Sequence, residues 1–139
     1  MTDKYRSGAP AEILLVEDNP GDVRLTREAF KEGQISNELH VATDGVEALE
    51  FLERRGEYES APRPDLVLLD WHFPKKSGEE VLQTVRADEE LREIPVVVLT
   101  GTQPELEKLQ SESPRADAYV LKPLEPEQCR SLDEEFCSD

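Results

Sequence analysis

The sequence is short of cysteine, of aromatic residues and above all of positive charge. It has 139 residues, of which two are cysteine and 6% are aromatic. Lysine and arginine total 16 against 32 aspartates and glutamates, so the formal net charge is −16. Phosphate backbones and anionic membrane surfaces attract basic proteins. The composition therefore argues against nucleic acid and against a membrane as partners.

Long hydrophobic runs are also absent. The longest uninterrupted apolar runs have four residues, as in Leu66–Leu69 and Val96–Leu99, whereas a membrane-spanning helix needs about 20. Met1–Pro10 is polar and mixed in charge, unlike a signal peptide. We expect a cytoplasmic protein with an N-terminal tail over residues 1–10 and a single domain over residues 11–137, with no output domain after it.

The two cysteines, Cys129 and Cys137, fit no zinc-binding or redox spacing. If both lie on one helix, a rise of about 1.5 Å per residue separates them by about 12 Å, which is too far for a disulfide. We expect reduced thiols, one of them facing the core, as in a reducing compartment.

The acidic residues are spread over the whole chain, and two explanations are open. The domain is either an unusually acidic mesophilic protein or one adapted to molar intracellular salt, as in an extreme halophile. Dissolved ions screen the repulsion among surface carboxylates, which favours the second explanation.

Short apolar segments alternate with segments of helical pattern. The five strand-like segments are Ala11–Val16, Leu39–Ala42, Leu66–Leu69, Ile94–Leu99 and Ala118–Leu121. The five helical segments are Asp22–Lys31, Val46–Arg55, Ser77–Arg86, Pro104–Gln110 and Pro126–Cys137. Most strand segments are near-continuous apolar runs, which is typical of strands covered on both faces. The alternation predicts an α/β fold with a five-stranded parallel sheet of order 2-1-3-4-5, flanked by five helices.

Local signals support several helix ends. Pro20 suits the first turn of a helix, and Gly33 and Gly56 suit the ends of the first two helices. Ser77 and Glu80 have the spacing of a capping box at the start of the third helix.

Polar side chains follow four of the five predicted strands. Glu17 and Asp18 follow the first strand, and Asp70 follows the third. Thr100 and Lys122 follow the fourth and the fifth. In a sheet of this strand order, ligands bind beyond the carboxyl ends of the strands. We therefore expect the five side chains to meet in one pocket.

The chemistry of this pocket is specific. Three neighbouring carboxylates stay ionised together only if a cation lies among them, and oxygen ligands without cysteine favour a hard ion such as Mg²⁺. Lys122 could neutralise Asp70 or an incoming phosphoryl oxygen, and Thr100 adds a hydrogen-bond donor. An aspartate can attack phosphorus and carry the phosphoryl group as an acyl phosphate.

Each residue also has a plainer explanation. Glu17 and Asp18 could cap the first helix, and Asp70 could belong to a turn. Lys122 could be a solvated loop lysine, and a threonine at a strand end is common. Coincidences at four of five strand ends are nevertheless hard to attribute to chance.

The motifs resemble the receiver domain of two-component response regulators, which has the CheY-like fold, over essentially the whole chain. The resemblance rests on LLVEDNP at 14–20, DLVLLDWHFPKKSG at 65–78, IPVVVLTG at 94–101 and AYVLKP at 118–123. More narrowly, EDNPGDVRLTREAF and PKKSGEEVL are similar to the stand-alone regulators that are paired with phytochrome-type sensor kinases.

The resemblance implies a role for each acidic residue of the pocket. Asp70 matches the phosphoacceptor, which takes a phosphoryl group from a phosphohistidine of a sensor histidine kinase. Glu17, Asp18 and Asp70 match the Mg²⁺ site, with the backbone carbonyl of His72 as a further ligand.

The resemblance also implies a switch. Lys122 matches the lysine that pairs with the phosphoryl oxygens, and the peptide bond between Lys122 and Pro123 is cis in this family. Thr100 matches the switch hydroxyl, and Tyr119 matches the aromatic residue that turns inward once Thr100 engages the phosphate. The face formed by the fourth helix, the fifth strand and the fifth helix would thereby change shape, and a partner protein would read it.

Some positions depart from the family pattern. Trp71 and His72 replace residues that are usually smaller or neutral, so the lifetime of the phosphoryl group is open; the His72 side chain is expected at the solvent-facing rim. The other histidine, His40, is expected to pack within its strand. Arg115 stands where a glycine is usual, and an early end of the fourth helix with a turn held by Pro114 is expected there.

Other classes of protein fit less well. A phosphatase of the haloacid-dehalogenase type needs a second aspartate at position 72, which is histidine. A flavodoxin-like protein needs a phosphate-binding loop after the first strand, where Glu17 and Asp18 would repel FMN. A receiver-shaped interaction module that is never phosphorylated stays open as an alternative.

The sequence thus predicts a single-domain response regulator and not an enzyme, with at most phosphorylation from small donors and slow self-dephosphorylation. It would signal by protein contact, by relay of the phosphoryl group to a second histidine, or through its own kinase. The short, acidic last helix favours a monomer or a weak homodimer.

Overall fold

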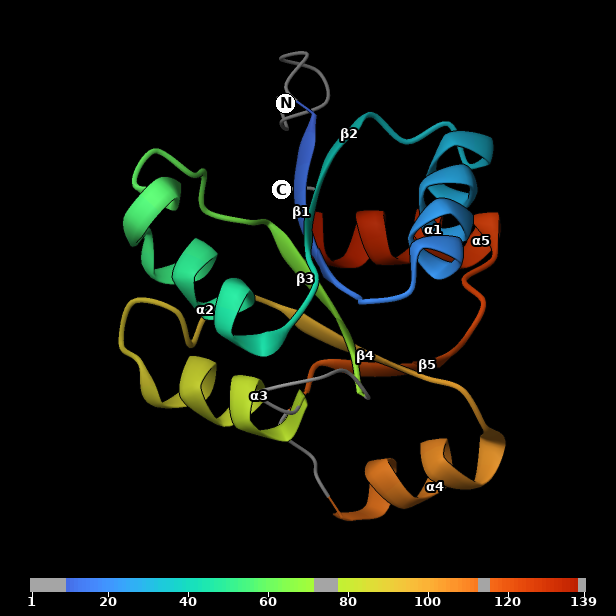
Figure 1. Ribbon diagram of the computed structural model, residues 1–139. Helices are drawn as coiled ribbons and strands as arrows, with labels where there is room; N and C mark the ends of the chain where they lie inside the picture. The colour runs from blue at the N-terminus through green and yellow to red at the C-terminus, as the bar shows by residue number, and fades with distance from the viewer. Residues whose placement is uncertain (1–9, 72–77, 113–115, 138–139) are drawn as a thin grey trace.

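The computed structural model describes residues 10–71, 78–112 and 116–137. Its five strands are β1 (Ala11–Val16), β2 (Asn37–Ala42), β3 (Leu66–Asp70), β4 (Val96–Thr100) and β5 (Ala118–Leu121). Its five α-helices are α1 (Pro20–Glu32), α2 (Gly45–Glu53), α3 (Gly78–Ala87), α4 (Gln103–Glu112) and α5 (Pro126–Leu132). Strands and helices alternate along the chain, and the strands form one sheet (Figure 1).

All strand pairs are parallel, and the strand order is β2-β1-β3-β4-β5, which confirms the predicted sheet. Successive side chains of a strand point to opposite faces of the sheet. The central strands β1, β3 and β4 therefore contribute side chains to two separate cores. In β1, Leu14 and Val16 belong to one core, whereas Ile13 and Leu15 belong to the other. Burial on both faces explains why these strands read as continuous apolar runs.

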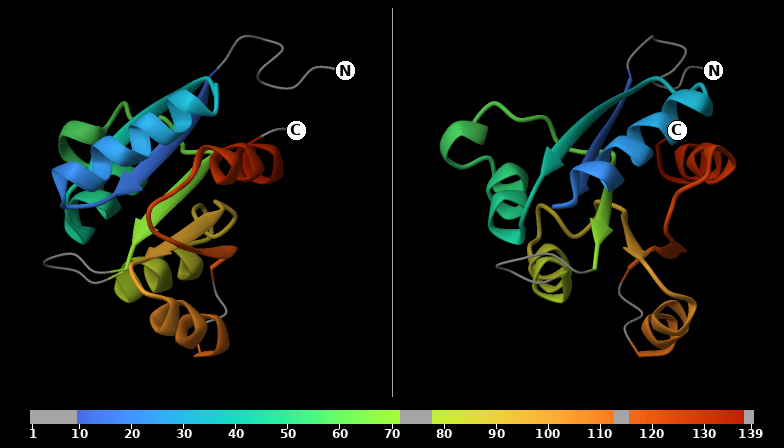
Figure 2. Two further views of the ribbon diagram at one scale, coloured as in Figure 1. Left: turned by 90° about the vertical axis from the view of Figure 1, so that its right-hand side faces the viewer. Right: turned by 45° about the vertical axis from the view of Figure 1, so that its right-hand side comes forward.

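Each core is closed by its own helices. Buried residues of α2, α3 and α4 lie on one face of the sheet, and buried residues of α1 and α5 lie on the other. Figures 1 and 2 show α1 beside α5 on one side, and Figure 1 shows α2 beside α3 on the opposite side. The residue that follows β1 and the last residue of β3 lie side by side at the carboxyl ends of the strands, where the site was predicted.

Three strands differ from their predicted bounds. β3 ends at Asp70 and β4 ends at Thr100, each one residue later than predicted. The second strand begins at Asn37, earlier than the predicted Leu39, because the polar residues Asn37 and Glu38 pair with β1 at the edge of the sheet. The fourth strand begins at Val96, later than the predicted Ile94. The Ile94 N–H donates to the Leu91 carbonyl at 2.9 Å and so belongs to the preceding turn.

α1 is longer at both ends than the predicted Asp22–Lys31, but the signals predicted at its start and end are confirmed. Asn19 caps the helix, since its side-chain oxygen accepts from the N–H groups of Gly21 and Asp22, and Pro20 lies in the first turn. Gly33 is the C-cap, as predicted.

The predicted end of the second helix at Arg55, before Gly56, is wrong. The helix ends at Glu53, because Arg54 itself adopts the left-handed conformation (φ 57°) that closes a helix. Gly56, with φ 59°, opens a 3₁₀ turn that runs to Tyr58.

The remaining helices also differ in part. The fourth helix continues to Glu112, beyond the predicted Gln110. The α-helix at the C-terminus ends at Leu132 and is followed by a π-helical turn, Asp133–Cys137, where one continuous helix was predicted. The capping-box residue Ser77, with Pro114 and Arg115, lies outside the described residues.

The cysteines and His40 lie within the fold. Cys129 and Cys137 form no disulfide, as predicted, but both are buried, whereas one was expected to face the core. His40 packs within its strand as expected: its Nε2 atom lies 2.8 Å from Glu12, and its ring centroid lies 5.2 Å from that of Phe51.

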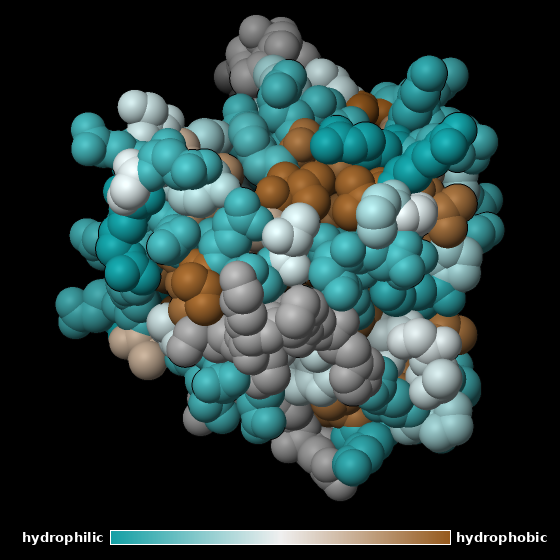
Figure 3. All heavy atoms as spheres, in the orientation of Figure 1, coloured by the Kyte–Doolittle hydropathy of each residue, from teal (hydrophilic) through white to brown (hydrophobic). Residues whose placement is uncertain are grey.

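The surface is largely hydrophilic, with apolar residues gathered over β2 and α1 in the view of Figure 3. Leu25 of α1 is half exposed. Among the described helices, none combines the length and apolar character that a membrane span requires.

Candidate functional site

Three carboxylates meet at the carboxyl ends of β1 and β3. Val16 of β1 pairs with Leu69 of β3, so the residues that follow them, Glu17 and Asp70, lie next to each other. Glu17 is 1% exposed and Asp70 is 5% exposed, whereas Asp18 is exposed. One carboxylate oxygen from each of the three lies within 4.8 Å of the others. The predicted acidic cluster is therefore present.

Glu17 is electrostatically strained in the absence of a cation. Burial, together with the adjacent Asp70 carboxylate, raises the pKa of Glu17 to about 7, and the nearby Lys122 ammonium offsets only part of this effect. A divalent cation among the three carboxylates would reverse the balance and favour the ionised form. A set of oxygen ligands with one open, exposed side suits a hard ion such as Mg²⁺.

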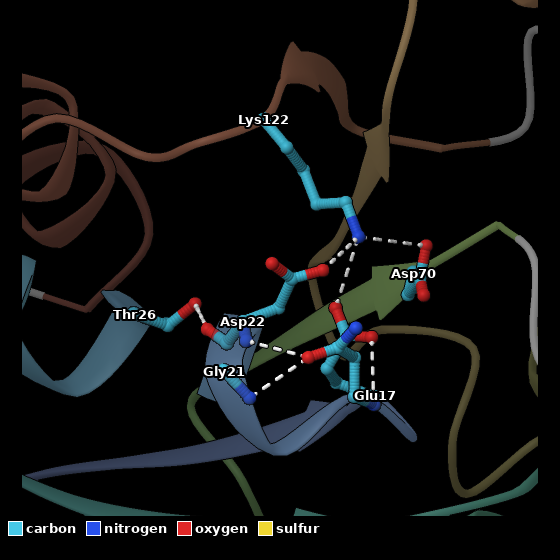
Figure 4. Close-up of polar contacts among 7 residues, drawn as sticks. Glu17, Gly21, Asp22, Thr26, Asp70 and Lys122 are labelled. Carbon is cyan, nitrogen blue, oxygen red and sulfur yellow. Dashed lines mark hydrogen bonds and ion pairs between the residues drawn. The ribbon is translucent and has the colours of Figure 1, made fainter. Parts of the chain in front are cut away.

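Lys122 reaches into the acidic cluster from the end of β5. Its Nζ atom lies 3.1 Å from a Glu17 oxygen, 2.9 Å from an Asp22 oxygen and 3.5 Å from an Asp70 oxygen (Figure 4). Burial lowers the pKa of Lys122, but its contacts with Asp22, Asp70 and Glu17 outweigh burial, so the pKa is raised overall. The ammonium is therefore fixed as a cation beside Asp70.

Asp22 is the site residue that the sequence analysis missed. It lies in the first turn of α1, and its carboxylate makes the shortest of the three contacts with Lys122. The cap formed by Asn19 fixes this turn, and the Thr26 hydroxyl donates to the Asp22 carbonyl at 2.9 Å. The sequence signal is an acid in the first helical turn, which by itself indicates only a favourable interaction with the helix dipole.

Thr100 lies at the predicted strand end, but its hydroxyl is not directed to the acidic cluster. The residue is fully buried, and its carbonyl accepts from the Lys122 N–H at 2.8 Å. The hydroxyl donates to a carboxylate oxygen of Glu105, in the first turn of α4. The sequence analysis did not anticipate Glu105.

Tyr119 lies on β5 and packs against the core on the side of α2, α3 and α4. Its hydroxyl oxygen is buried and has no hydrogen-bond partner among the described residues. The peptide bond between Lys122 and Pro123 is cis, as expected. His72, whose carbonyl is the predicted fourth ligand, lies outside the described residues.

Comparison with known proteins places this geometry in a family. The family model of the response regulator receiver domain matches residues 13–132. Response regulator Rcp1 of Synechocystis sp. is 44% identical over 122 residues, which cover 88% of this chain and 82% of Rcp1.

Solved structures agree with the sequence match. The bacteriophytochrome response regulator AtBRR has a TM-score of 0.83 and 43% identity, over 92% of this chain and 93% of that chain. The phosphorylated cyanobacterial phytochrome response regulator RcpA has a TM-score of 0.78 and 38% identity, over 93% and 95% of the two chains. The chain is a response regulator of the CheY-like fold and belongs to the receiver domain family.

Proposed function

We propose that Asp70 is the phosphoacceptor of this response regulator. The observation that carries the proposal is a buried carboxylate at the end of β3, with a lysine ammonium 3.5 Å away and two further carboxylates in contact range. An Asp70 oxygen attacks phosphorus of a kinase phosphohistidine, the bond from phosphorus to the imidazole nitrogen breaks, and the acyl phosphate remains on Asp70.

Glu17, Asp18 and Asp70 would hold Mg²⁺, with the backbone carbonyl of His72 as a further ligand. The ion supplies positive charge for the phosphoryl oxygens during transfer. The raised pKa of Glu17 supports this assignment, because the Lys122 ammonium offsets only part of the cost of two buried carboxylates side by side. A solved structure of the relative Rcp1 is described as its Mn²⁺-bound form.

Phosphorylation adds charge and strong acceptor oxygens at Asp70. Lys122 pairs with these oxygens, and Thr100 turns its hydroxyl toward them. Tyr119 is proposed to respond to the movement of Thr100, so that the face of α4, β5 and α5 changes its shape for a partner protein. The protein acts in this way as a signalling switch, with at most slow self-dephosphorylation.

The proposed phosphoryl donor is a sensor histidine kinase of phytochrome type. The relatives AtBRR and RcpA are described as phytochrome or bacteriophytochrome response regulators, and they are about 40% identical to this chain over more than nine tenths of its length. We further propose a cytoplasmic location and a receiver domain that extends over residues 11–137, after a tail of residues 1–10.

Intact mass spectrometry tests the proposal. The protein is incubated with acetyl phosphate and Mg²⁺, at low salt and in molar KCl, beside Asp70→Asn and a sample without Mg²⁺. We expect one added phosphoryl group in the wild type and none in either control. If the adduct forms neither at low salt nor in molar KCl, in protein shown to be folded by circular dichroism, the result would favour an interaction module that is not phosphorylated.

A further inference from the structure

The contact between Thr100 and Glu105 joins the end of β4 to α4. Thr100 is fully buried, and its hydroxyl donates to the Glu105 carboxylate. A threonine hydroxyl carries a single hydrogen. It therefore cannot make this bond and donate to a phosphoryl oxygen on Asp70 at the same time.

Glu105 is held by the start of its helix. The Thr102 carbonyl accepts from the Leu106 N–H at 3.0 Å, and the Thr102 hydroxyl accepts from the Glu105 N–H at 3.4 Å. The pair Thr102 and Glu105 has the spacing of a capping box, in which the glutamate side chain turns back to the helix start. In this structure the carboxylate accepts a hydrogen bond from the hydroxyl of Thr100, at the end of the preceding strand.

Two further observations connect this bond with the face that is proposed to switch. Leu109, one turn after Glu105, is buried in the same core against which Tyr119 packs. The Tyr119 hydroxyl is buried without a partner among the described residues, which disfavours the present arrangement of α4 and β5. Other contacts must offset this unfavourable burial and hold α4 in place, and the bond from Thr100 to Glu105 is one of them.

We propose that Glu105 is a positioning residue that holds the Thr100 hydroxyl away from Asp70 until a phosphoryl group is present. Engagement of the phosphoryl group by Thr100 breaks the bond to Glu105 and releases the first turn of α4. Glu105 thereby sets the threshold of the switch and couples the site to α4. The inference rests on the proposed function, because it requires a phosphoryl group on Asp70.

The direction of the effect follows from linkage. A ligand shifts a two-state equilibrium only by its different affinity for the two states. The bond from Thr100 to Glu105 exists in the unphosphorylated state and is lost in the phosphorylated state, so it opposes switching. Removal of Glu105 should increase the apparent affinity for a phosphoryl analogue by about tenfold or more, because a hydrogen bond to a charged group has a larger net strength than one between neutral groups.

Beryllium fluoride with Mg²⁺ is a suitable probe, because it binds a carboxylate as an analogue of the phosphoryl group. Trp71, the single tryptophan of the chain, directly follows Asp70 and can report binding by its fluorescence. We would titrate the wild type, Glu105→Ala and Glu107→Ala. Glu107 is an exposed acid on the same helix, so the control removes an equal charge without affecting Thr100.

We expect tighter binding by Glu105→Ala and unchanged binding by Glu107→Ala. Glu105→Gln, which preserves the capping-box chemistry but weakens the charge-assisted bond to Thr100, should fall between the wild type and Glu105→Ala. In a Thr100→Ala background, Glu105→Ala should have no effect. Melting temperatures of all variants show whether each is folded.

The outcomes separate the two proposals. If the wild type does not respond to beryllium fluoride, the proposed function fails. If the wild type responds but Glu105→Ala binds no more tightly than Glu107→Ala, the inference about Glu105 fails alone. It also fails if the effect of Glu105→Ala persists in the Thr100→Ala background, because Glu105 would then act through the helix cap or through charge.

Discussion

Replacement of Glu17 by glutamine should stabilise the metal-free protein at neutral and alkaline pH. Glu17 is 1% exposed and adjoins the Asp70 carboxylate, so its ionisation in the folded state is unfavourable. Its pKa is raised from 4.5 to about 7 in the folded protein. Glutamine has nearly the same shape and carries no charge at any pH, so the substitution removes this unfavourable ionisation.

The sign and size follow from proton linkage. Between pH 4.5 and about pH 7, Glu17 keeps its proton in the folded state but has lost it in the unfolded state. The free energy of unfolding therefore falls as pH rises through this interval. Below pH 4.5, Glu17 is protonated in both the folded and the unfolded state, and the stabilising effect of its raised pKa is fully present. One pKa unit corresponds to about 1.4 kcal/mol, so the advantage of Glu17→Gln should grow by about 2–3 kcal/mol between about pH 4.5 and about pH 8.

Urea unfolding of both proteins between about pH 4.5 and about pH 8, with EDTA and with Mg²⁺, measures this advantage. Glu107→Gln, on an exposed part of α4, controls for the loss of one negative charge. Mg²⁺ should stabilise the wild type most at high pH and should affect Glu17→Gln much less. A difference in unfolding free energy between wild type and Glu17→Gln that does not change with pH would refute the reasoning.

Three further predictions concern packing, a thiol and the acidic surface. Gly78→Ala should destabilise the fold by about 1–3 kcal/mol in chemical unfolding, because a Cβ atom would lie 2.9 Å from the Trp71 ring and 3.1 Å from its carbonyl oxygen. Gly101→Ala, where nothing lies within 4 Å of the new atom, should be neutral. Burial raises the pKa of Cys129 to about 12, so a thiol reagent at about pH 8 should label it only after unfolding; rapid labelling of the native protein would contradict this. If the net charge of −16 reflects adaptation to salt, the melting temperature should rise with KCl concentration, and a constant melting temperature would exclude that explanation.

Much of the fold could be predicted because the central strands are buried on both faces. Burial requires continuous apolar runs, and such runs are visible in the sequence without any knowledge of the third dimension. The bounds were less accurate where backbone geometry decided them. Arg54 closes α2 in a left-handed conformation that arginine rarely adopts, and Ile94 satisfies its backbone in a turn although its side chain suits a strand.

Most of the candidate site could be predicted for a related reason. Parallel strands bring their carboxyl ends to one edge, so residues placed directly after β1, β3 and β5 must converge. Glu17, Asp70 and Lys122 do so. Asp22 and Glu105 could not be identified in this way, because each lies in the first turn of a helix, where an acid is common.

The sequence by itself determined the α/β alternation and the residues at the strand ends, because apolar periodicity and position after a strand are properties of the chain. The strand order followed from the general rule for parallel sheets of this size. The tertiary structure alone decided which partners those residues have. Asp22 contacts Lys122 because of where α1 begins above the sheet, and Glu105 receives the Thr100 hydroxyl because of how α4 packs beside β5. The first contact joins residues 100 positions apart, and the second depends on how the chain turns between β4 and α4, so neither follows from a local sequence pattern.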